Sequence, residues 1–469
     1  MHYHLIGICG TAMASLAGML LACGHKVTGS DQSVYPPMST QLEALGIEIM
    51  QGYHAQNANV GAECTIVGNT ISRGNPELEE VLNRKLLYRS QAEIVKELFI
   101  RGKRSLVVAG THGKTTTTSI AAWVMEVGGL NPGFLVGGIV QNFDVSFRVT
   151  DSDHFVIEGD EYDTAYFDKK PKFMHYLPET AIVNNIEFDH ADIYDDLDDI
   201  KWEFSRLMNL VPGNGRLIVG IDSPGAAEVL DEMTGKLFTN VETFGLSDDA
   251  KWQARYIDFS GDTTRFTVFK DGQIWGGFET HLIGEFNVRN SLAVIIAADT
   301  WGVSKEKMQE AFRTFKSVKR RVEVRGTIGG VTIIDDFAHH PTAVEETLKA
   351  LRMKYDGHRL IAVFEPRSWS SRLAIFQKPY AKAFVYADYV IIAGVFNTSK
   401  AGELGKVLDT EELVKEIEMQ SKPAMTMPDA DSIVAHLTRE LSEGDVVAIM
   451  SNGGFGGIHE KILEALKNN

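Results

Sequence analysis

The chain has 469 residues, 44% of them hydrophobic, and a formal net charge of −17 at pH 7. This length predicts about three domains, and the acidic balance argues against a general nucleic-acid-binding protein. The chain has only three cysteines, no apolar run long enough to span a bilayer and no signal-peptide pattern at its start, so we expect a cytoplasmic protein with no membrane partner.

The first region, residues 1–103, alternates strands with helices in a Rossmann-like pattern. A strand that begins at His4 is expected to turn into a helix, and the residues at this turn are Gly7, Gly10 and Thr11. The turn lacks the third glycine of the dinucleotide fingerprint. The next strand ends at Ser30 and Asp31, where a carboxylate often meets a ribose hydroxyl. A βαβ unit without a ligand would show the same pattern, so both interpretations stay open here.

The most informative motif follows the apolar run 106–109 and reads Gly110-Thr111-His112-Gly113-Lys114-Thr115. A predicted helix over residues 116–127 comes next. Strand, glycine turn, Lys-Thr and helix surround a nucleotide phosphate with backbone N–H groups. Lys114 can reach the outer phosphates, and the Thr115 hydroxyl can bind magnesium. Val108 replaces the first glycine of the strict Walker A pattern. The alternative is a tight turn with a surface lysine, but we interpret the stretch as a shortened phosphate loop for ATP and Mg²⁺.

Two later strands of the same region end in candidate metal ligands. The strand over residues 154–158 ends at Glu158, and the strand at 180–185 is followed by His190. Because the carboxyl ends of parallel strands meet at one edge of a sheet, both residues should lie beside the phosphate loop. A hard cation prefers oxygen, so Glu158 is the natural ligand and His190 a less usual one. Solvated acids and a structural histidine would fit the same pattern.

Three further motifs extend the candidate site. Asn287 and Asn290 can hydrogen-bond an adenine edge, or they can cap a helix. The basic cluster Lys319-Arg320-Arg321 is either a solvated patch or a source of positive charge for a transferred phosphate. The strand over residues 331–336 ends at Asp336 and starts a third region of strand–helix alternation.

These patterns predict an α/β fold of three domains. We expect a Rossmann-like N-terminal domain over residues 1–103 and a central phosphate-loop ATPase domain with a mainly parallel sheet over residues 104–321. A Rossmann-like C-terminal domain should cover residues 322–469.

The ordered motifs of the chain resemble those of the Mur ligases. They are 109–115, Asn185-Ile186-Glu187-Phe188-Asp189-His190, Asn287-x-x-Asn290, Arg320-Arg321 and 335–341. The resemblance covers essentially the whole chain. It implies an ATP-dependent ligase that joins UDP-N-acetylmuramate to an amino acid or peptide through an acyl phosphate, with a mobile C-terminal domain.

Some stretches resemble the branch of this family that recycles cell-wall peptides. These stretches are 30–39, 167–170, 187–193, 365–368 and 450–459. They imply that the acceptor is the tripeptide L-alanyl-γ-D-glutamyl-meso-diaminopimelate. A ligase that adds L-alanine and an ATP-driven nucleotide switch are the alternatives. One departure from the family pattern is Phe286, which stands where a histidine is usual.

The resemblance also implies roles for individual residues. At the UDP-sugar end it places Gly7, Gly10, Thr11, Ser30 and Asp31. At the ATP end it places Gly110, Thr111, His112, Gly113, Lys114, Thr115, Thr116, Asn287, Asn290, Arg321 and Asp336. The metal ligands implied are Thr115 for the magnesium at the ATP phosphates, and Glu158 and His190 for a second magnesium. The catalytic set is Lys114, Glu158, His190 and Arg321. For the peptide we select Arg367, Arg372 and Asn452, because guanidinium groups bind carboxylates well and these residues follow predicted strands.

Overall fold

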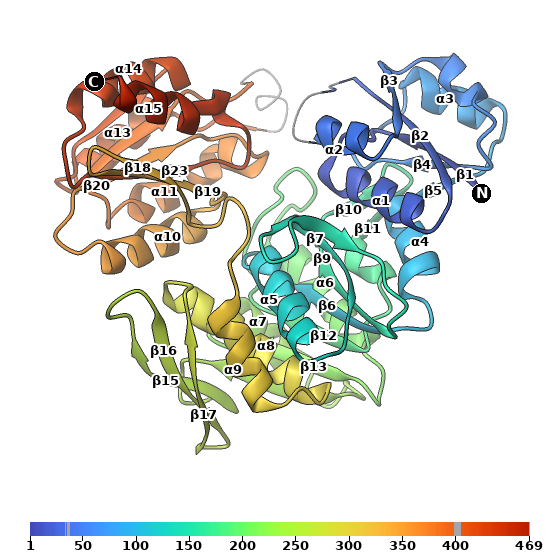
Figure 1. Cartoon of the computed structure of the whole chain (residues 1–469), viewed down its shortest axis with the longest axis horizontal. Coiled ribbons are helices and arrows are strands. Elements are labelled where there is room, and N and C mark those ends of the chain that lie inside the picture. The colour runs from blue at the N-terminus through green and yellow to red at the C-terminus, as the bar shows by residue number, and fades with distance from the viewer. Residues whose placement is uncertain (33, 35–37, 398–404, 469) are drawn as a thin grey trace.

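The computed structural model describes the chain except residues 33, 35–37, 398–404 and 469. Three sheets follow one another along the chain and form three lobes (Figure 1). The N-terminal lobe is blue, the central lobe runs from cyan to yellow, and the C-terminal lobe is orange to red. The Tyr35-Pro36-Pro37 part of the predicted stretch 30–39 lies outside the described residues.

The first sheet is parallel and has the strand order β3-β2-β1-β4-β5. Its strands are β1 (His2–Ile6), β2 (Lys26–Asp31), β3 (Glu48–Gln51), β4 (Cys64–Val67) and β5 (Tyr88–Ser90). The accompanying helices are α1 (Thr11–Ala22), α2 (Met38–Ala44), α3 (Pro76–Asn83) and α4 (Gln91–Val95). The strand order reverses at β1, and the carboxyl ends around such a reversal form a ligand crevice in α/β sheets. Gly7 and Asp31 both lie at that edge.

The central sheet has ten strands in the order β17-β16-β15-β14-β13-β12-β6-β9-β7-β8. The run from β15 to β7 is parallel, while β16, β17 and β8 pair antiparallel at the two edges. The strands are β6 (Arg104–Ala109), β7 (Gly133–Val140), β8 (Val145–Arg148), β9 (His154–Gly159), β12 (Thr180–Val183), β13 (Arg216–Gly220), β14 (Asn240–Gly245), β15 (Trp252–Asp258), β16 (Thr264–Lys270) and β17 (Gln273–Thr280). A separate hairpin consists of β10 (Asp163–Ala165) and β11 (Asp168–Pro171).

Five helices belong to the central lobe. They are α5 (Lys114–Val127), α6 (Leu197–Leu210), α7 (Pro224–Glu232), α8 (Glu285–Thr300) and α9 (Lys305–Thr314). The helix predicted over residues 116–127 therefore begins two residues earlier, so that Lys114 and Thr115 form its first turn. None of the helices in the described part of the chain has the length and apolar character needed to cross a membrane.

The third sheet has the order β18-β19-β23-β20-β21-β22, parallel except for the edge strand β18. Its strands are β18 (Glu323–Ile328), β19 (Val331–Asp336), β20 (Leu360–Phe364), β21 (Tyr389–Ala393), β22 (Ala424–Met427) and β23 (Val446–Met450). The helices are α10 (Pro341–Lys354), α11 (Gln377–Ala383), α13 (Thr410–Glu418), α14 (Ala430–Glu440) and α15 (Ile458–Lys467).

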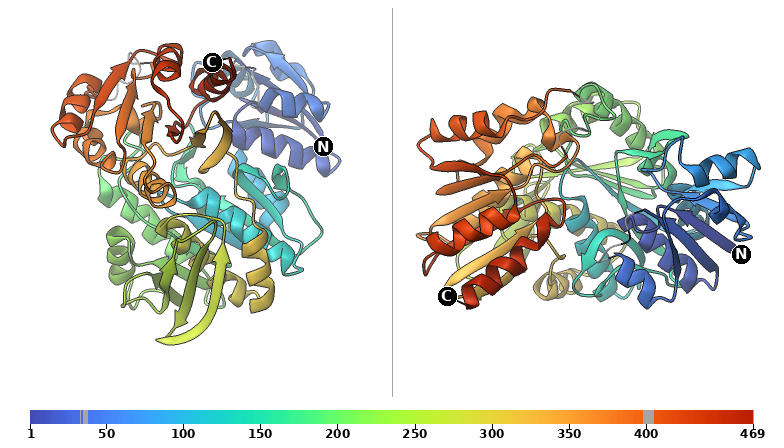
Figure 2. Two further views of the ribbon diagram at one scale, coloured as in Figure 1. Left: turned by 60° about the vertical axis from the view of Figure 1, so that its left-hand side comes forward. Right: turned by 90° about the horizontal axis from the view of Figure 1, so that it is seen from above.

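The buried hydrophobic clusters join two of the three lobes. One buried cluster contains residues of both the first and the central sheet, including Leu5 and Ile157. At this junction Gly18 of α1 packs against Phe147, because a Cβ at Gly18 would lie 2.2 Å from the Phe147 ring. The C-terminal sheet is covered by two further clusters whose buried members all belong to the C-terminal lobe. The right-hand view of Figure 2 shows the C-terminal lobe at one end of the molecule and the N-terminal lobe at the other. The first two lobes therefore share a continuous core, and the third has an independent one.

Candidate active site

The predicted phosphate loop connects β6 to α5. Gly110 and Gly113 have φ values of +139° and +76°, which favour glycine. A Cβ at Gly110 would lie 3.0 Å from Asn184 Cβ, and one at Gly113 would lie 2.7 Å from Asn290 Oδ1. Asn290, predicted to lie near adenine, thus packs against the phosphate loop. Both glycines are required by the backbone conformation and by close packing.

Lys114 is held at the start of α5 by a carboxylate that we did not select from the sequence. Its Nζ lies 2.6 Å from Glu161 Oε2 and 2.8 Å from the Gly110 carbonyl oxygen. Burial lowers the pKa of Lys114, but Glu161 and Asp160 outweigh it and the net shift is upward. Glu161 has a pKa of about 2, because Lys114 and His190 overcome the opposing effect of burial. The lysine is therefore a partly buried cation beside the phosphate loop.

His190 approaches the same carboxylate from the other side. Its Nε2 lies 3.0 Å from Glu161 Oε1, and its backbone has a φ of +54°. Burial lowers the pKa of His190, but Asp189 and Glu161 raise it to about 9. Glu161 therefore bridges Lys114 and His190. The only sequence signal for this role was its place in the run of acids after β9, three residues beyond Glu158.

Thr115 and Glu158 form an oxygen pair suited to magnesium. Thr115 Oγ1 donates to Glu158 Oε1 at 2.7 Å, and Glu158 Oε2 accepts from the Gly137 N–H at 2.7 Å. Adjacent ligands of an octahedral magnesium ion lie about 3 Å apart, so this pair matches one edge of its coordination sphere. Burial and the neighbouring Asp160 raise the pKa of Glu158. A divalent cation would stabilise the charged form of Glu158.

Arg321 reaches this pair from the connection between the central and C-terminal lobes. Its Nη2 lies 3.1 Å from Thr115 Oγ1, and its guanidinium packs over the Phe337 ring. The predicted Asp336 accepts from the backbone N–H groups of Val322 and Ala338, each at 2.8 Å. Asp336 thus fixes the backbone directly after Arg321, at Val322, and the turn that follows β19, at Ala338.

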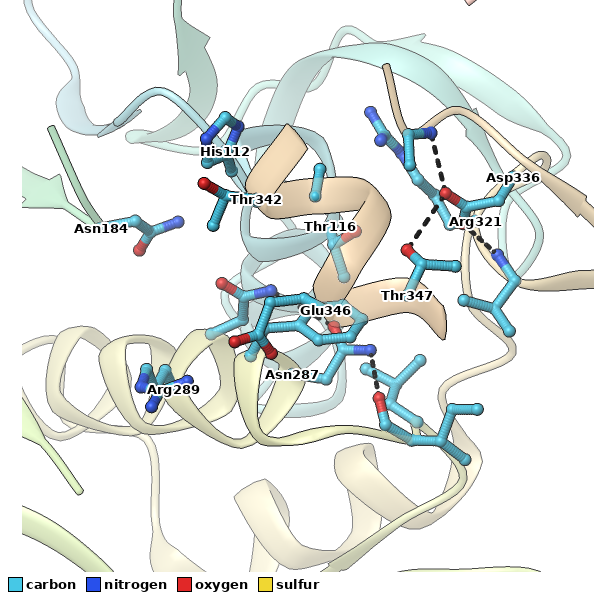
Figure 3. A pocket seen from close by; sticks show the side chains of 18 of the residues that line it. His112, Thr116, Asn184, Asn287, Arg289, Arg321, Asp336, Thr342, Glu346 and Thr347 are labelled. Atoms are coloured by element: carbon cyan, nitrogen blue, oxygen red, sulfur yellow. Dashed lines mark hydrogen bonds between the residues drawn. The ribbon is translucent and has the colours of Figure 1, made fainter. Parts of the chain in front are cut away.

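A cavity of about 520 Å³ lies between the phosphate loop, α8 and α10. Sequence reasoning selected some of its lining residues, namely His112, Gly113, Thr116, Asn287, Asn290, Arg321 and Asp336. It missed Asn184, Arg289, Thr342 and Glu346 (Figure 3). The Asn287 side chain donates to the Ile283 carbonyl oxygen at 2.9 Å, which holds its amide at the cavity wall. Phe286 also lines the cavity.

The two lobes that enclose this cavity are joined by hydrogen bonds around Glu187. Thr342 Oγ1 donates to Glu187 Oε2 at 2.6 Å, and the His112 and His340 rings lie 4.4 Å apart. His112, Glu187 and His340 are close enough to hold a metal ion. However, His340 Nε2 donates to the Phe188 carbonyl oxygen at 3.0 Å, which leaves Nδ1 to accept from the Thr342 N–H at 3.3 Å. The imidazole is thus already used as a contact between lobes.

The residues predicted for the UDP-sugar lie at the carboxyl edge of the first sheet. Asp31 Oδ2 accepts from the Cys9 N–H at 2.9 Å, across the turn that contains Gly7 and Gly10. Ser30 Oγ is buried without a hydrogen-bond partner among the described residues. Thr11 is exposed at the start of α1.

The three predicted peptide-binding residues differ in their surroundings. Arg372 is buried and donates to the carbonyl oxygens of Ser368 and Phe396, each at 3.2 Å, so it holds its own loop together. Arg367 is partly exposed and packs over the Phe396 ring at 4.0 Å. Asn452 Oδ1 is buried and has no hydrogen-bond partner in the described part of the chain.

Comparison with known protein families identifies the family to which the chain belongs. The family model for the Mur ligase family, catalytic domain, matches residues 2–103, and that for the Mur ligase middle domain matches 108–298. The model for the Mur ligase, glutamate ligase domain, matches residues 320–453. The chain belongs to the Mur ligase family. The predicted family and the predicted three-domain α/β fold are therefore confirmed, and this Mur ligase is an ATP-dependent, ADP-forming enzyme.

Individual Mur ligases resemble the chain over its full length. The UDP-N-acetylmuramate–L-alanyl-γ-D-glutamyl-meso-2,6-diaminoheptandioate ligase of Escherichia coli is 42% identical over 99% of this chain and 98% of its own. The UDP-N-acetylmuramate–L-alanine ligase of Salinibacter ruber is 34% identical over 99% of this chain and 95% of its own. The crystal structure of a murein peptide ligase from Psychrobacter arcticus has a TM-score of 0.76 at 35% identity and covers 100% of this chain and 99% of its own.

Proposed function

We propose that this Mur ligase joins UDP-N-acetylmuramate to the tripeptide L-alanyl-γ-D-glutamyl-meso-diaminopimelate with cleavage of ATP, in peptidoglycan recycling. The observation that carries the proposal is the chain of contacts from Arg321, which lines the cavity, to Thr115 of the phosphate-loop helix and on to Glu158. The peptide acceptor is supported by the names of the Escherichia coli and Psychrobacter arcticus relatives.

In the first step the carboxylate oxygen of the sugar's lactyl group attacks the γ-phosphorus of ATP. An acyl phosphate forms, and the bond to the bridging oxygen of ADP breaks. Lys114 and Arg321 place positive charge where the transferred phosphoryl group carries negative charge. Thr115 and Glu158 would hold Mg²⁺, which neutralises phosphate charge when bound, and His190 supports this set through Glu161.

In the second step the α-amine of the acceptor attacks the acyl carbon. A C–N bond forms, inorganic phosphate leaves, and the amine loses a proton. Because water would hydrolyse the acyl phosphate, the site must be closed during this step. Contacts between lobes at Glu187, Thr342 and His340 close one side of the cavity.

The individual site residues follow the same proposal. The UDP-sugar would lie at Gly7, Gly10, Thr11, Ser30 and Asp31 of a domain spanning residues 1–103. The peptide would meet the C-terminal domain, residues 322–469, at Arg367 and Asn452. The orphaned Asn452 oxygen supports this placement, since a buried amide oxygen calls for a donor such as a peptide N–H.

An end-point assay tests the function directly. Purified enzyme is incubated with ATP, Mg²⁺, UDP-N-acetylmuramate and either the tripeptide or L-alanine. The mass of the nucleotide-sugar product is then determined by mass spectrometry. We expect the tripeptide adduct. Product from L-alanine alone would move the chain to the alanine-adding enzymes, as the Salinibacter ruber relative suggests. ATP hydrolysis with no coupled product would favour a nucleotide switch.

A further inference from the structure

Glu346 of α10 brings a carboxylate from the C-terminal lobe into the cavity beside the phosphate loop. It lines the same cavity as Gly113, Thr116 and Asn287, and Figure 3 shows it among the side chains that surround this cavity. Its Oε2 atom is buried and has no hydrogen-bond partner among the described residues. A buried carboxylate oxygen without a partner is costly, so the position calls for a hydrogen-bond donor.

The cations near Glu346 are paired with other groups. Arg289 Nε donates to Asp222 Oδ2 at 2.7 Å, and Lys349 Nζ donates to Glu285 Oε2 at 2.8 Å. Burial raises the pKa of Glu346, and Glu285 and Glu345 add to this effect, while Arg289 and Lys349 oppose it. The protein itself therefore supplies positive charge near the carboxylate but no direct donor to the buried oxygen.

The position of Glu346 indicates which part of a nucleotide it can meet. The phosphate loop fixes the phosphates at Lys114 and Thr115, and a carboxylate repels a triphosphate. The hydrogen-bond donors of ATP are the exocyclic amino group of adenine and the ribose hydroxyls, all in the nucleoside. The carboxylate of Glu346 can therefore accept a hydrogen bond from the nucleoside of ATP but not from the triphosphate.

We propose that Glu346 accepts a hydrogen bond from the nucleoside of bound ATP and makes the C-terminal domain part of nucleotide recognition. The proposal rests on the proposed function, because it requires ATP in this cavity. α8 and the phosphate loop contact the nucleotide from the central domain, and Glu346 contacts it from the facing α10. ATP then bridges the two domains through its nucleoside as well as through its phosphates.

The experiment compares nucleotide affinities of the full-length wild type with those of Glu346→Ala. Calorimetric titrations use MgATP, purine riboside 5′-triphosphate, which lacks the amino group, and 2′,3′-dideoxy-ATP, which lacks the hydroxyls. Glu345→Ala is the matched control, because Glu345 is the exposed neighbour on the same helix. Melting curves check that both variants fold.

We expect Glu346→Ala to bind MgATP about 10- to 100-fold more weakly, as for loss of a hydrogen bond to a charged group, and Glu345→Ala to bind normally. With the analogue that lacks the donor, wild type and Glu346→Ala should bind alike, which identifies the donor as base or ribose. Unchanged MgATP affinity in Glu346→Ala, or an equal loss with all three nucleotides, would overturn the proposal. Failure of the wild type to bind MgATP at all would instead refute the nucleotide site itself.

Discussion

The Thr342 hydroxyl donates a 2.6 Å hydrogen bond to Glu187 Oε2 and so connects the first turn of α10 to the segment that follows β12. The same carboxylate lies 3.4 Å from His112 Nε2, within the phosphate loop. The pKa of Glu187 is about 2, because its hydrogen bond from His112 and the other nearby polar groups overcome the opposing effect of burial. One carboxylate therefore couples the position of the C-terminal domain to the conformation of the phosphate loop.

Removal of this contact should slow turnover without unfolding the protein. Thr342→Val preserves the shape of the side chain and removes the donor, which leaves Glu187 without its closest partner. We expect kcat to fall about 10-fold or more, the usual effect of a lost hydrogen bond to a charged group. Steady-state kinetics and a melting curve measure both effects. Thr327→Val, at an exposed position of β18, serves as the control, and equal kcat in the two variants would contradict the coupling.

Lys114→Ala should abolish ligation. The lysine supplies charge to the transferred phosphoryl group, and loss of one such group costs about 100-fold or more in rate. The fold should persist, because Glu161 retains His190 as a partner. Phosphate release in the presence of all three substrates is the measurement. Near-normal turnover would refute the assignment of the phosphate loop.

The magnesium dependence of the activity should test the roles of Glu158 and His190 beside the phosphate loop. Glu158→Ala and His190→Ala are each expected to raise the magnesium concentration for half-maximal activity, the first directly and the second through Glu161. Asp153→Asn, an exposed acid just before the same strand, is the control. If the magnesium titration is unchanged in both site variants, these residues have a structural role only.

Acidification should weaken the junction at His340. Burial, with the repulsion of His112, lowers the pKa of His340 to about 4, although Asp189 and Glu187 oppose this shift. Because the unfolded chain then binds the proton that the folded protein excludes, stability falls as the pH drops from about 6.5 to about 4, by at most about 3 kcal/mol. His340→Asn retains a capping acceptor for α10 and removes the titrating group. Urea unfolding at several pH values should show a smaller slope in this variant, and an identical slope would exclude His340 as the cause.

Two adjacent glycines of the loop after β23 should differ in their tolerance of alanine. A Cβ at Gly453 would lie 2.0 Å from Arg367 Nε, whereas a Cβ at Gly454 has no atom within 4 Å. Gly453→Ala must therefore displace Arg367, and we expect a lower kcat/KM for the tripeptide with the KM for ATP unchanged. Gly454→Ala should behave as wild type, and Arg367→Ala should reproduce the defect. Equal behaviour of the two glycine variants would argue against Arg367 in peptide binding.

Local patterns explain what the sequence could predict. The phosphate loop, the strand end at Glu158 and the Asn287–Asn290 pair depend on short-range spacing. In the structure the loop and both asparagines line one cavity, and Glu158 is hydrogen-bonded to Thr115 next to the loop. Glu161 was harder to select, because four acids lie within residues 158–163, at the end of β9 and directly after it, and only the side-chain direction separates them. The division of the chain at residues 103 and 321 stays a prediction, although the sheets occupy residues 2–90, 104–280 and 323–450.

Contacts between lobes could not be predicted in this way. Thr342 and Glu346 lie on α10, whose sequence is typical of an ordinary amphipathic helix, and Glu187, the partner of Thr342, is 155 residues away along the chain. Arg372 shows the opposite case. As one of several arginines near a strand end it resembled a ligand-binding residue, yet its donors are used by carbonyl oxygens of its own loop.

The core that continues from the first sheet into the central sheet has a consequence for the order of events. The UDP-sugar site and the phosphate loop would lie on one rigid unit, because Gly18 packs against Phe147, whereas the acceptor would be bound by a domain with a separate core. Activation of the lactyl group then needs no movement between the first two binding sites. The movement of the third domain would then set the rate of the reaction, and the amine would be the last reactant to enter.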